Sequence, residues 1–80
     1  MTSPPQPPRA VVIGASAGAL DALSAVLPVL PGGYPLPVAV VVHLPPDKKS
    51  VMVDLLRAKC RTNVKEAEDK EPFAPGTVYL

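Results

Sequence analysis

The sequence predicts an α/β fold, the N-terminal part of a doubly wound, mostly parallel sheet with the element order βαβαββ. Two nearly continuous apolar runs, residues 10–13 and 37–43, are typical of strands covered on both faces. Each run is followed by a segment with helical apolar spacing. Short connections join these segments, as expected for right-handed βαβ crossovers.

The first strand is expected over residues 10–13, after a proline-rich flexible tail at residues 1–8. Small residues at 14–18 allow a tight turn into a helix. One apolar stripe of this helix is formed by leucines at spacings of three, four and three: Leu20, Leu23, Leu27 and Leu30. We expect Pro28 to end or kink the helix near Val26 and Leu27.

The remaining elements are expected as a strand, a helix and two short strands, over residues 37–43, 50–61, 63–67 and 77–80. The apolar side of the second helix should be formed by Met52, Leu55, Leu56 and Lys59. A charged stretch, residues 66–71, reads as a solvated turn. Because the chain stops within an apolar strand, we expect residues 9–80 to be an incomplete domain.

Composition excludes several classes of function. Apolar residues make up 48% of the chain and charged residues 19%, which is enough to build a core. A net charge of +1 gives no electrostatic reason to expect nucleic acid or an anionic membrane as partner. No apolar segment is long enough to span a bilayer, and no signal peptide is recognisable. With Cys60 as its single cysteine, the chain cannot form an internal disulfide, and we expect a cytoplasmic location.

Two polar residues follow the predicted strands at the ends where α/β sheets place their sites. Ser16 comes after the first strand and His43 ends the second. If these parallel strands are neighbours, about 4.8 Å apart, the hydroxyl and the imidazole can approach for nucleophilic acyl transfer. The spacing Gly14-Ala-Ser16-Ala-Gly18 fits a nucleophile elbow, in which the backbone N–H groups of Ala17 and Gly18 are oxyanion candidates.

Other roles fit the same residues. Ser16 could cap the first helix, and His43 could bind a loop carbonyl. The glycines at 14 and 18 also suit a nucleotide-binding βαβ unit, but the third glycine is missing and His43 replaces the expected acidic residue. A non-catalytic fragment or binding module, whose loop docks a partner, is a further alternative. Cys60 is expected to be an unreactive packed or surface thiol.

Four segments together make the chain resemble the catalytic domain of the chemotaxis protein-glutamate methylesterases, the CheB family. The segments occur in the family's order and at similar spacings: Val12-Ile-Gly-Ala-Ser-Ala-Gly18, Val42-His-Leu-Pro-Pro46, Val64-Lys-Glu-Ala-Glu-Asp69 and Pro75-Gly-Thr-Val-Tyr-Leu80. They cover nearly the whole sequence after the proline-rich tail. The resemblance implies a doubly wound α/β domain.

The resemblance also implies an activity. Family members hydrolyse glutamate methyl esters on the cytoplasmic domains of chemoreceptors and release methanol, and some deamidate receptor glutamines. The triad is Ser, His and Asp, with its serine at Ser16 and its histidine at His43. No metal and no organic cofactor is implied. Methylated chemoreceptors are the implied partners, and the oligomeric state stays open.

Three departures from the family pattern bear on activity. Gly18-Ala19 stands where the family usually has Gly-Gly. No receiver domain precedes the first strand, so phosphorylation control in cis is not expected. The triad aspartate is expected beyond residue 80, and no aspartate of this chain matches it. Since loss of the triad acid costs roughly 10⁴-fold in rate, we expect the 80-residue chain alone to be nearly inactive and marginally folded.

Overall fold

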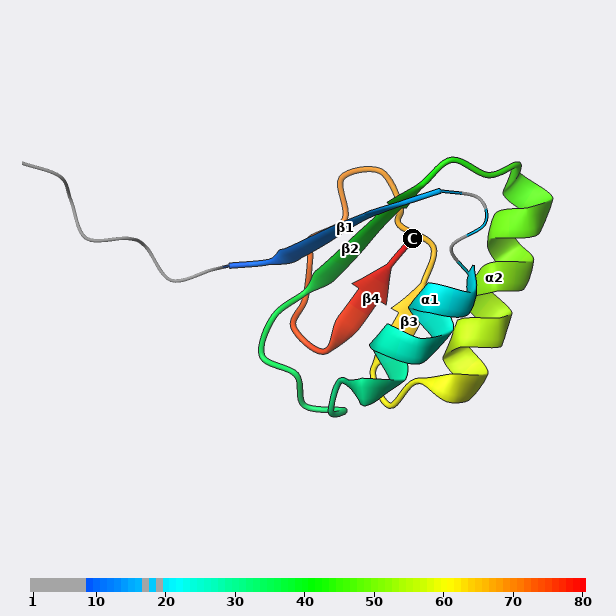
Figure 1. Cartoon of the computed structure of the whole chain (residues 1–80). Coiled ribbons are helices and arrows are strands. Elements are labelled where there is room, and N and C mark those ends of the chain that lie inside the picture. Colours follow the sequence, from blue (N-terminus) through cyan, green and yellow to red (C-terminus); the bar gives the residue numbers. More distant parts are fainter. Residues whose placement is uncertain (1–8, 17, 19) are drawn as a thin grey trace, which may run out of the picture.

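A computed structural model describes residues 9–16, 18 and 20–80 of the chain. Figure 1 shows a small parallel sheet with two helices packed on one of its faces. The elements are, in chain order, β1 (Val11–Ala15), α1 (Leu20–Val26), the 3₁₀ helix η1 (Leu27–Val29), β2 (Val38–Val42), α2 (Pro46–Lys59), β3 (Asn63–Lys65) and β4 (Thr77–Tyr79). The expected tail at residues 1–8 lies outside the described residues.

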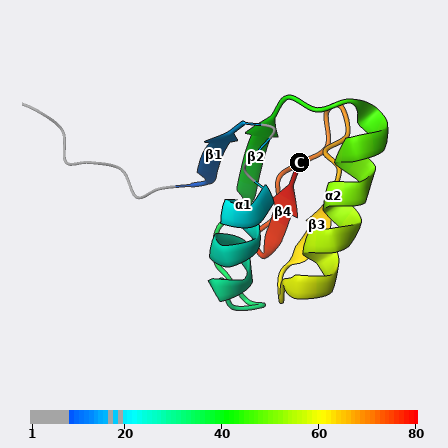
Figure 2. The same cartoon turned by 45° about the vertical axis from the view of Figure 1, so that its right-hand side comes forward.

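The predicted α/β class and the order βαβαββ are confirmed. The four strands lie in the order β1-β2-β4-β3, and every neighbouring pair is parallel. The connections from β1 to β2 and from β2 to β3 step across the sheet in the same direction. Right-handed crossovers therefore place α1 and α2 on the same face, as Figure 2 shows.

The core lies between that face of the sheet and the two helices. Its buried members are apolar side chains from β2, β3, β4 and the residue after β4, from both helices and from η1: Leu23, Leu27, Val38, Val40, Val42, Met52, Val53, Leu56, Val64, Val78 and Leu80. The β1 residues Val11, Ile13 and Ala15 are partly buried against this set. Branched residues dominate the strands because they pack well on a pleated surface. Burial of this set is the main term that stabilises the fold.

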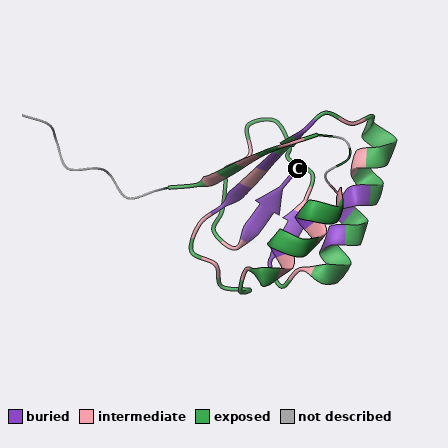
Figure 3. Ribbon diagram, in the orientation of Figure 1, coloured by how far each residue is buried: buried purple, intermediate pink, exposed green. Residues whose placement is uncertain are grey.

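The opposite face of the sheet is only partly covered, and the cover lies over β4. Phe73, from the connection between β3 and β4, stacks on Tyr79 with ring centroids 4.6 Å apart. The backbone N–H of Ala74 also donates to the Tyr79 hydroxyl at 2.7 Å. On β1 and β2, by contrast, Val12 and Val41 are exposed, as Figure 3 shows for these strands. The prediction that the first and second strands are covered on both faces is therefore wrong for the described residues.

Two predicted boundaries need correction. β1 continues to Ala15, two residues past the predicted end, because residues 14 and 15 still pair with β2. The second helix begins at Pro46 rather than at residue 50. Proline suits the first helical position, since its missing N–H has no partner there and its φ angle is already helical. Asp47 in the first turn adds a favourable interaction with the helix dipole.

The buried face of α2 also differs from the prediction. Met52 and Leu56 are buried as expected, but Val53 is buried in place of Leu55, which is exposed. Lys59 is exposed at the end of the helix. Arg57 of α2 donates two hydrogen bonds to the carbonyl oxygen of Val64 on β3, from Nε at 3.1 Å and from Nη2 at 3.0 Å. These bonds connect the helix to the strand.

Pro28 lies where the first helix changes type, so the predicted break near Val26 and Leu27 is confirmed. α1 ends at Val26, and η1 continues for three residues with the proline in its first turn. A 3₁₀ turn tolerates proline there because the lost N–H is one of those without an intrahelical partner. The break lets Leu27 remain fully buried beneath the sheet.

Candidate active site

Ser16 and His43 lie at equivalent positions on neighbouring strands. The last paired residues of β1 and β2 are Ala15 and Val42, and Ser16 and His43 follow them directly. The assumption that the two strands are neighbours is thus confirmed. Both residues lie at the carboxyl edge of the sheet, which is where α/β folds place their ligands.

Both side chains are open to solvent. Ser16 and His43 are exposed residues just outside regular secondary structure. The hydrogen bonds found between described residues include none that joins them. A nucleophile and its base are often loosely arranged before substrate binds, so their proximity is the relevant observation. An exposed pair also suits a substrate that is itself a macromolecule.

The loop after β1 is partly described. α1 begins at Leu20, so Ser16 is too far upstream to be its N-cap, and the capping alternative is not supported. Gly18 lies in an exposed turn, with open space where a Cβ would stand. The other oxyanion candidate, Ala17, and the departure at Ala19 lie outside the described residues. The oxyanion assignment therefore stays a prediction from spacing.

Ser16 also borders a recess between β1 and α1. The recess has a volume of about 330 Å³. It is lined by the end of β1 and by one side of α1: Ile13, Gly14, Ala15, Ser16, Ala22, Leu23 and Val26. Ser16, the candidate nucleophile, thus lies at the edge of this recess and not on a flat surface.

Glu66, the polar residue that follows β3, belongs to another contact. Glu66 directly follows β3, and both of its carboxylate oxygens are 3.3 Å from the Ser50 hydroxyl of α2. Since β4 lies between β2 and β3, Glu66 is two strand spacings from β2, and the register puts it level with Val40, three residues before His43. It is therefore not placed to orient the imidazole. The described residues supply no carboxylate that the structure pairs with His43.

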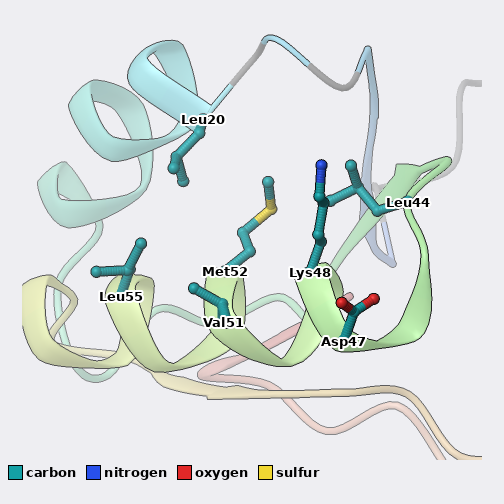
Figure 4. A pocket seen from close by; sticks show the side chains of 7 residues that line it. All are labelled: Leu20, Leu44, Asp47, Lys48, Val51, Met52 and Leu55. Atoms are coloured by element: carbon teal, nitrogen blue, oxygen red, sulfur yellow. The ribbon is translucent and has the colours of Figure 1, made fainter.

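A groove next to the pair was not anticipated from the sequence. It lies between α1 and α2, has a volume of about 320 Å³, and is mostly apolar. Figure 4 shows its lining side chains: Leu20, Leu44, Asp47, Lys48, Val51, Met52 and Leu55. The sequence feature that could have indicated the groove is the pair Val51 and Leu55. These apolar residues are four positions apart, so they lie on one side of the helix, and this side is not its buried face.

Other chemistries find no support in the described part of the chain. No group of three or more His, Cys, Asp or Glu residues there could hold a metal ion. Burial raises the pKa of the Cys60 thiol, which keeps it protonated and unreactive near neutral pH. Within the described residues, none of the helices has the length and apolar character needed to cross a membrane.

Comparison with known proteins gives a consistent picture. Residues 11–80 match the CheB methylesterase family. Two similar proteins are both described as "Protein-glutamate methylesterase/protein-glutamine glutaminase". One, from Desulfotalea psychrophila, is 43% identical over 70 residues, which are 88% of this chain and 19% of that protein. The other, from Thermotoga maritima, is 39% identical over 80 residues, which are 100% of this chain and 23% of that protein.

A solved structure agrees with the sequence comparisons. The crystal structure of the Thermotoga maritima CheB methylesterase catalytic domain matches this fold with a TM-score of 0.84 and 41% sequence identity. The match covers 89% of this chain and 38% of that chain. The chain therefore spans about a fifth of the length of these two curated relatives and less than half of the solved domain.

Proposed function

The chain belongs to the CheB methylesterase family, and we propose that it supplies the nucleophile and the general base of a protein-glutamate methylesterase. Residues 9–80 form the N-terminal portion of the catalytic domain, and the substrate is a glutamate methyl ester on the cytoplasmic domain of a chemoreceptor. Ser16 is the nucleophile and His43 the base. The observation that supports these roles best is their position, each one residue beyond the paired Ala15 and Val42.

In the first half of the reaction, Ser16 Oγ attacks the carbonyl carbon of the methyl ester while His43 takes the hydroxyl proton. The bond to the methoxy group then breaks, and methanol leaves with the proton that His43 returns. The glutamyl group remains bound to Ser16 as an ester. Backbone N–H groups of Ala17 and Gly18 are proposed to hold the oxyanion that forms on the carbonyl.

In the second half, a water molecule replaces methanol. His43 takes a proton from the water, whose oxygen attacks the acyl ester, and returns the proton to Ser16 Oγ as the bond to serine breaks. The products are a glutamate carboxylate and the regenerated hydroxyl. A glutamine side chain would follow the same course with ammonia in place of methanol, which accounts for the second activity in the relatives' names.

The alternation of burial along β1 and β2 supports the proposal that the Ser16 and His43 side chains lie on the same face of the sheet. Val11, Ile13 and Ala15 are more buried than their neighbours, as are Val38, Val40 and Val42. Extending each alternation by one residue puts Ser16 and His43 on the same side of the sheet edge. The acid that orients His43 is not assigned to a residue of this chain.

The proposal is tested in a chimera, in which residues 11–80 replace the matching segment of the Thermotoga maritima CheB methylesterase catalytic domain. Methanol release from a methylated chemoreceptor fragment is measured for the chimera, for its Ser16→Ala variant and for the 80-residue chain alone. We expect release from the unsubstituted chimera, a loss of about 10⁴-fold or more with Ser16→Ala, and almost none from the isolated chain. Release that survives Ser16→Ala would favour the alternative of a non-catalytic binding module.

A further inference from the structure

We propose that Pro45 and Pro46 are positioning residues for His43. By restricting the backbone of the connection that carries His43, the two prolines keep its imidazole at the carboxyl end of β2, beside the Ser16 position. This inference rests on the proposed function, because it says how the proposed base is kept in place. It assigns neither proline a contact with the substrate.

The connection from β2 to α2 is short, as Figure 1 shows. β2 ends at Val42 and α2 begins at Pro46. Only His43, Leu44 and Pro45 lie between them. Val42 is buried and Leu44 is packed against the core, whereas His43 between them is exposed. The core therefore anchors the chain on both sides of His43.

The imidazole of His43 has no anchor of its own among the described residues. None of the side-chain hydrogen bonds and ion pairs found between them involves His43. Because the side chain is also exposed, its position depends on the backbone that carries it. A base that must take a proton from a nearby hydroxyl works faster when its position is restricted before the substrate binds.

Two adjacent prolines supply this restriction through their covalent structure. Each pyrrolidine ring fixes its own φ angle at about −65°, and the residue before a proline is kept out of the helical region. Leu44 and Pro45 both precede a proline, so both are confined to extended conformations. Pro45 has a φ angle of −57° and a ψ angle of 149°, which agrees with both restrictions. Pro46 then begins α2, where a proline is favoured.

The prolines act through the backbone and not through their side chains. Both are exposed, and Pro45 makes no side-chain capping hydrogen bond to α2. The carbonyl of Pro45 accepts a hydrogen bond from the Lys49 N–H at 3.0 Å, and the carbonyl of Pro46 accepts one from the Ser50 hydroxyl at 3.2 Å. Alanine at either position keeps these carbonyls. It therefore removes the ring's restriction and little else.

Steady-state kinetics of methanol release from a methylated chemoreceptor fragment test the inference in the chimera. We expect Pro45→Ala and Pro46→Ala to lower kcat about 2- to 5-fold each and about 4- to 25-fold together, in proportion to the backbone freedom that a proline removes. KM should stay unchanged, because neither proline contacts the substrate. Pro45→Gly should lower kcat further than Pro45→Ala, since glycine restricts the backbone least. Pro75→Ala, in an exposed turn of the β3–β4 connection, is the matched control and should leave kcat unchanged.

A double-mutant cycle with His43→Gln separates positioning of the base from a general structural role. If the prolines act through His43, changing both to alanine should have almost no further effect on the residual rate of the His43→Gln chimera. An equal fall in rate with and without His43, an unchanged kcat in the doubly substituted chimera, or the same fall with Pro75→Ala would overturn the inference. Failure of the proposed function would appear separately, because His43→Gln alone would then leave methanol release unchanged.

Discussion

Ser16 and His43 are each the first residue after a paired position of two neighbouring parallel strands, Ala15 on β1 and Val42 on β2. This relationship depends on the register between β1 and β2, which the apolar side chains on the helix-facing side determine. A shift by one residue would turn those side chains away from the helices. The core therefore positions the two candidate catalytic residues, although neither belongs to it.

The first prediction concerns the contact of α2 with the sheet. Leu56→Ala should lower the free energy of unfolding by about 2–5 kcal/mol, because Leu56 is 0% exposed and its removal leaves a cavity. Leu55→Ala is a matched control on the same helix, and we expect it to cost less than about 1 kcal/mol. Urea unfolding of the chimera, followed by circular dichroism, measures both. Similar costs for the two variants would contradict the buried face described for α2.

The second prediction concerns the turn before β4. Gly76 has a φ angle of +73°, and a Cβ there would lie 3.3 Å from the carbonyl oxygen of Gly32. Gly76→Ala should therefore destabilise the fold by about 1–2 kcal/mol through backbone strain alone. Gly33→Ala adds its methyl to open space, so its effect should stay within about 0.5 kcal/mol. If thermal unfolding of the chimera does not distinguish the two variants, the left-handed turn is not required.

The third prediction concerns the pH dependence of the 66–71 turn. Lys65 Nζ donates to Glu71 Oε2 at 2.7 Å, and the Glu68 N–H donates to Glu71 Oε1 at 2.7 Å. These bonds lower the pKa of Glu71 below its ordinary value of 4.5, and the Glu71 carboxylate raises the pKa of Lys65 above 10.5. The contact therefore stabilises the fold fully between these two ordinary values.

Its loss follows from the direction of each shift. A carboxyl with a lowered pKa stops stabilising the fold as the pH falls through the folded-state pKa, and a lysine with a raised pKa does so as the pH rises through its own. Glu71→Gln should therefore lower the melting temperature near pH 7, and by less near pH 3, which is below the ordinary pKa of 4.5. Asp69→Asn, an exposed change in the same turn, should have little effect at either pH. An equal loss with Glu71→Gln at both pH values would mean that the ion pair contributes nothing.

The strand order along the chain and the parallel sheet could be predicted from the sequence, because continuous apolar runs and leucine spacing are local patterns. Neighbouring positions for β1 and β2, and hence for Ser16 and His43, followed from the same patterns. The insertion of β4 between β2 and β3 could not be predicted, since it depends on long-range pairing. The choice of Val53 over Leu55 as a buried residue depends on how α2 packs on β3, which its own periodicity does not specify.

Pro45 and Pro46 explain the largest boundary error. A pair of prolines usually indicates a turn, but here the first is the N-cap residue of α2 and the second its first helical residue. The groove was missed for a related reason. Its lining combines residues from α1, α2 and the residue after His43, which come together only when both helices lie on one face.

The most direct test of the central claim is covalent labelling of the chimera with a fluorophosphonate, a reagent that reacts with activated serine hydroxyls. Mass spectrometry of the digested protein then locates the adduct. We expect it on Ser16, with fluoride released, and we expect His43→Gln to slow its formation by about 100-fold or more because the base is lost. Labelling of another residue, or an unchanged rate with His43→Gln, would contradict the assignment of Ser16 and His43 as nucleophile and base.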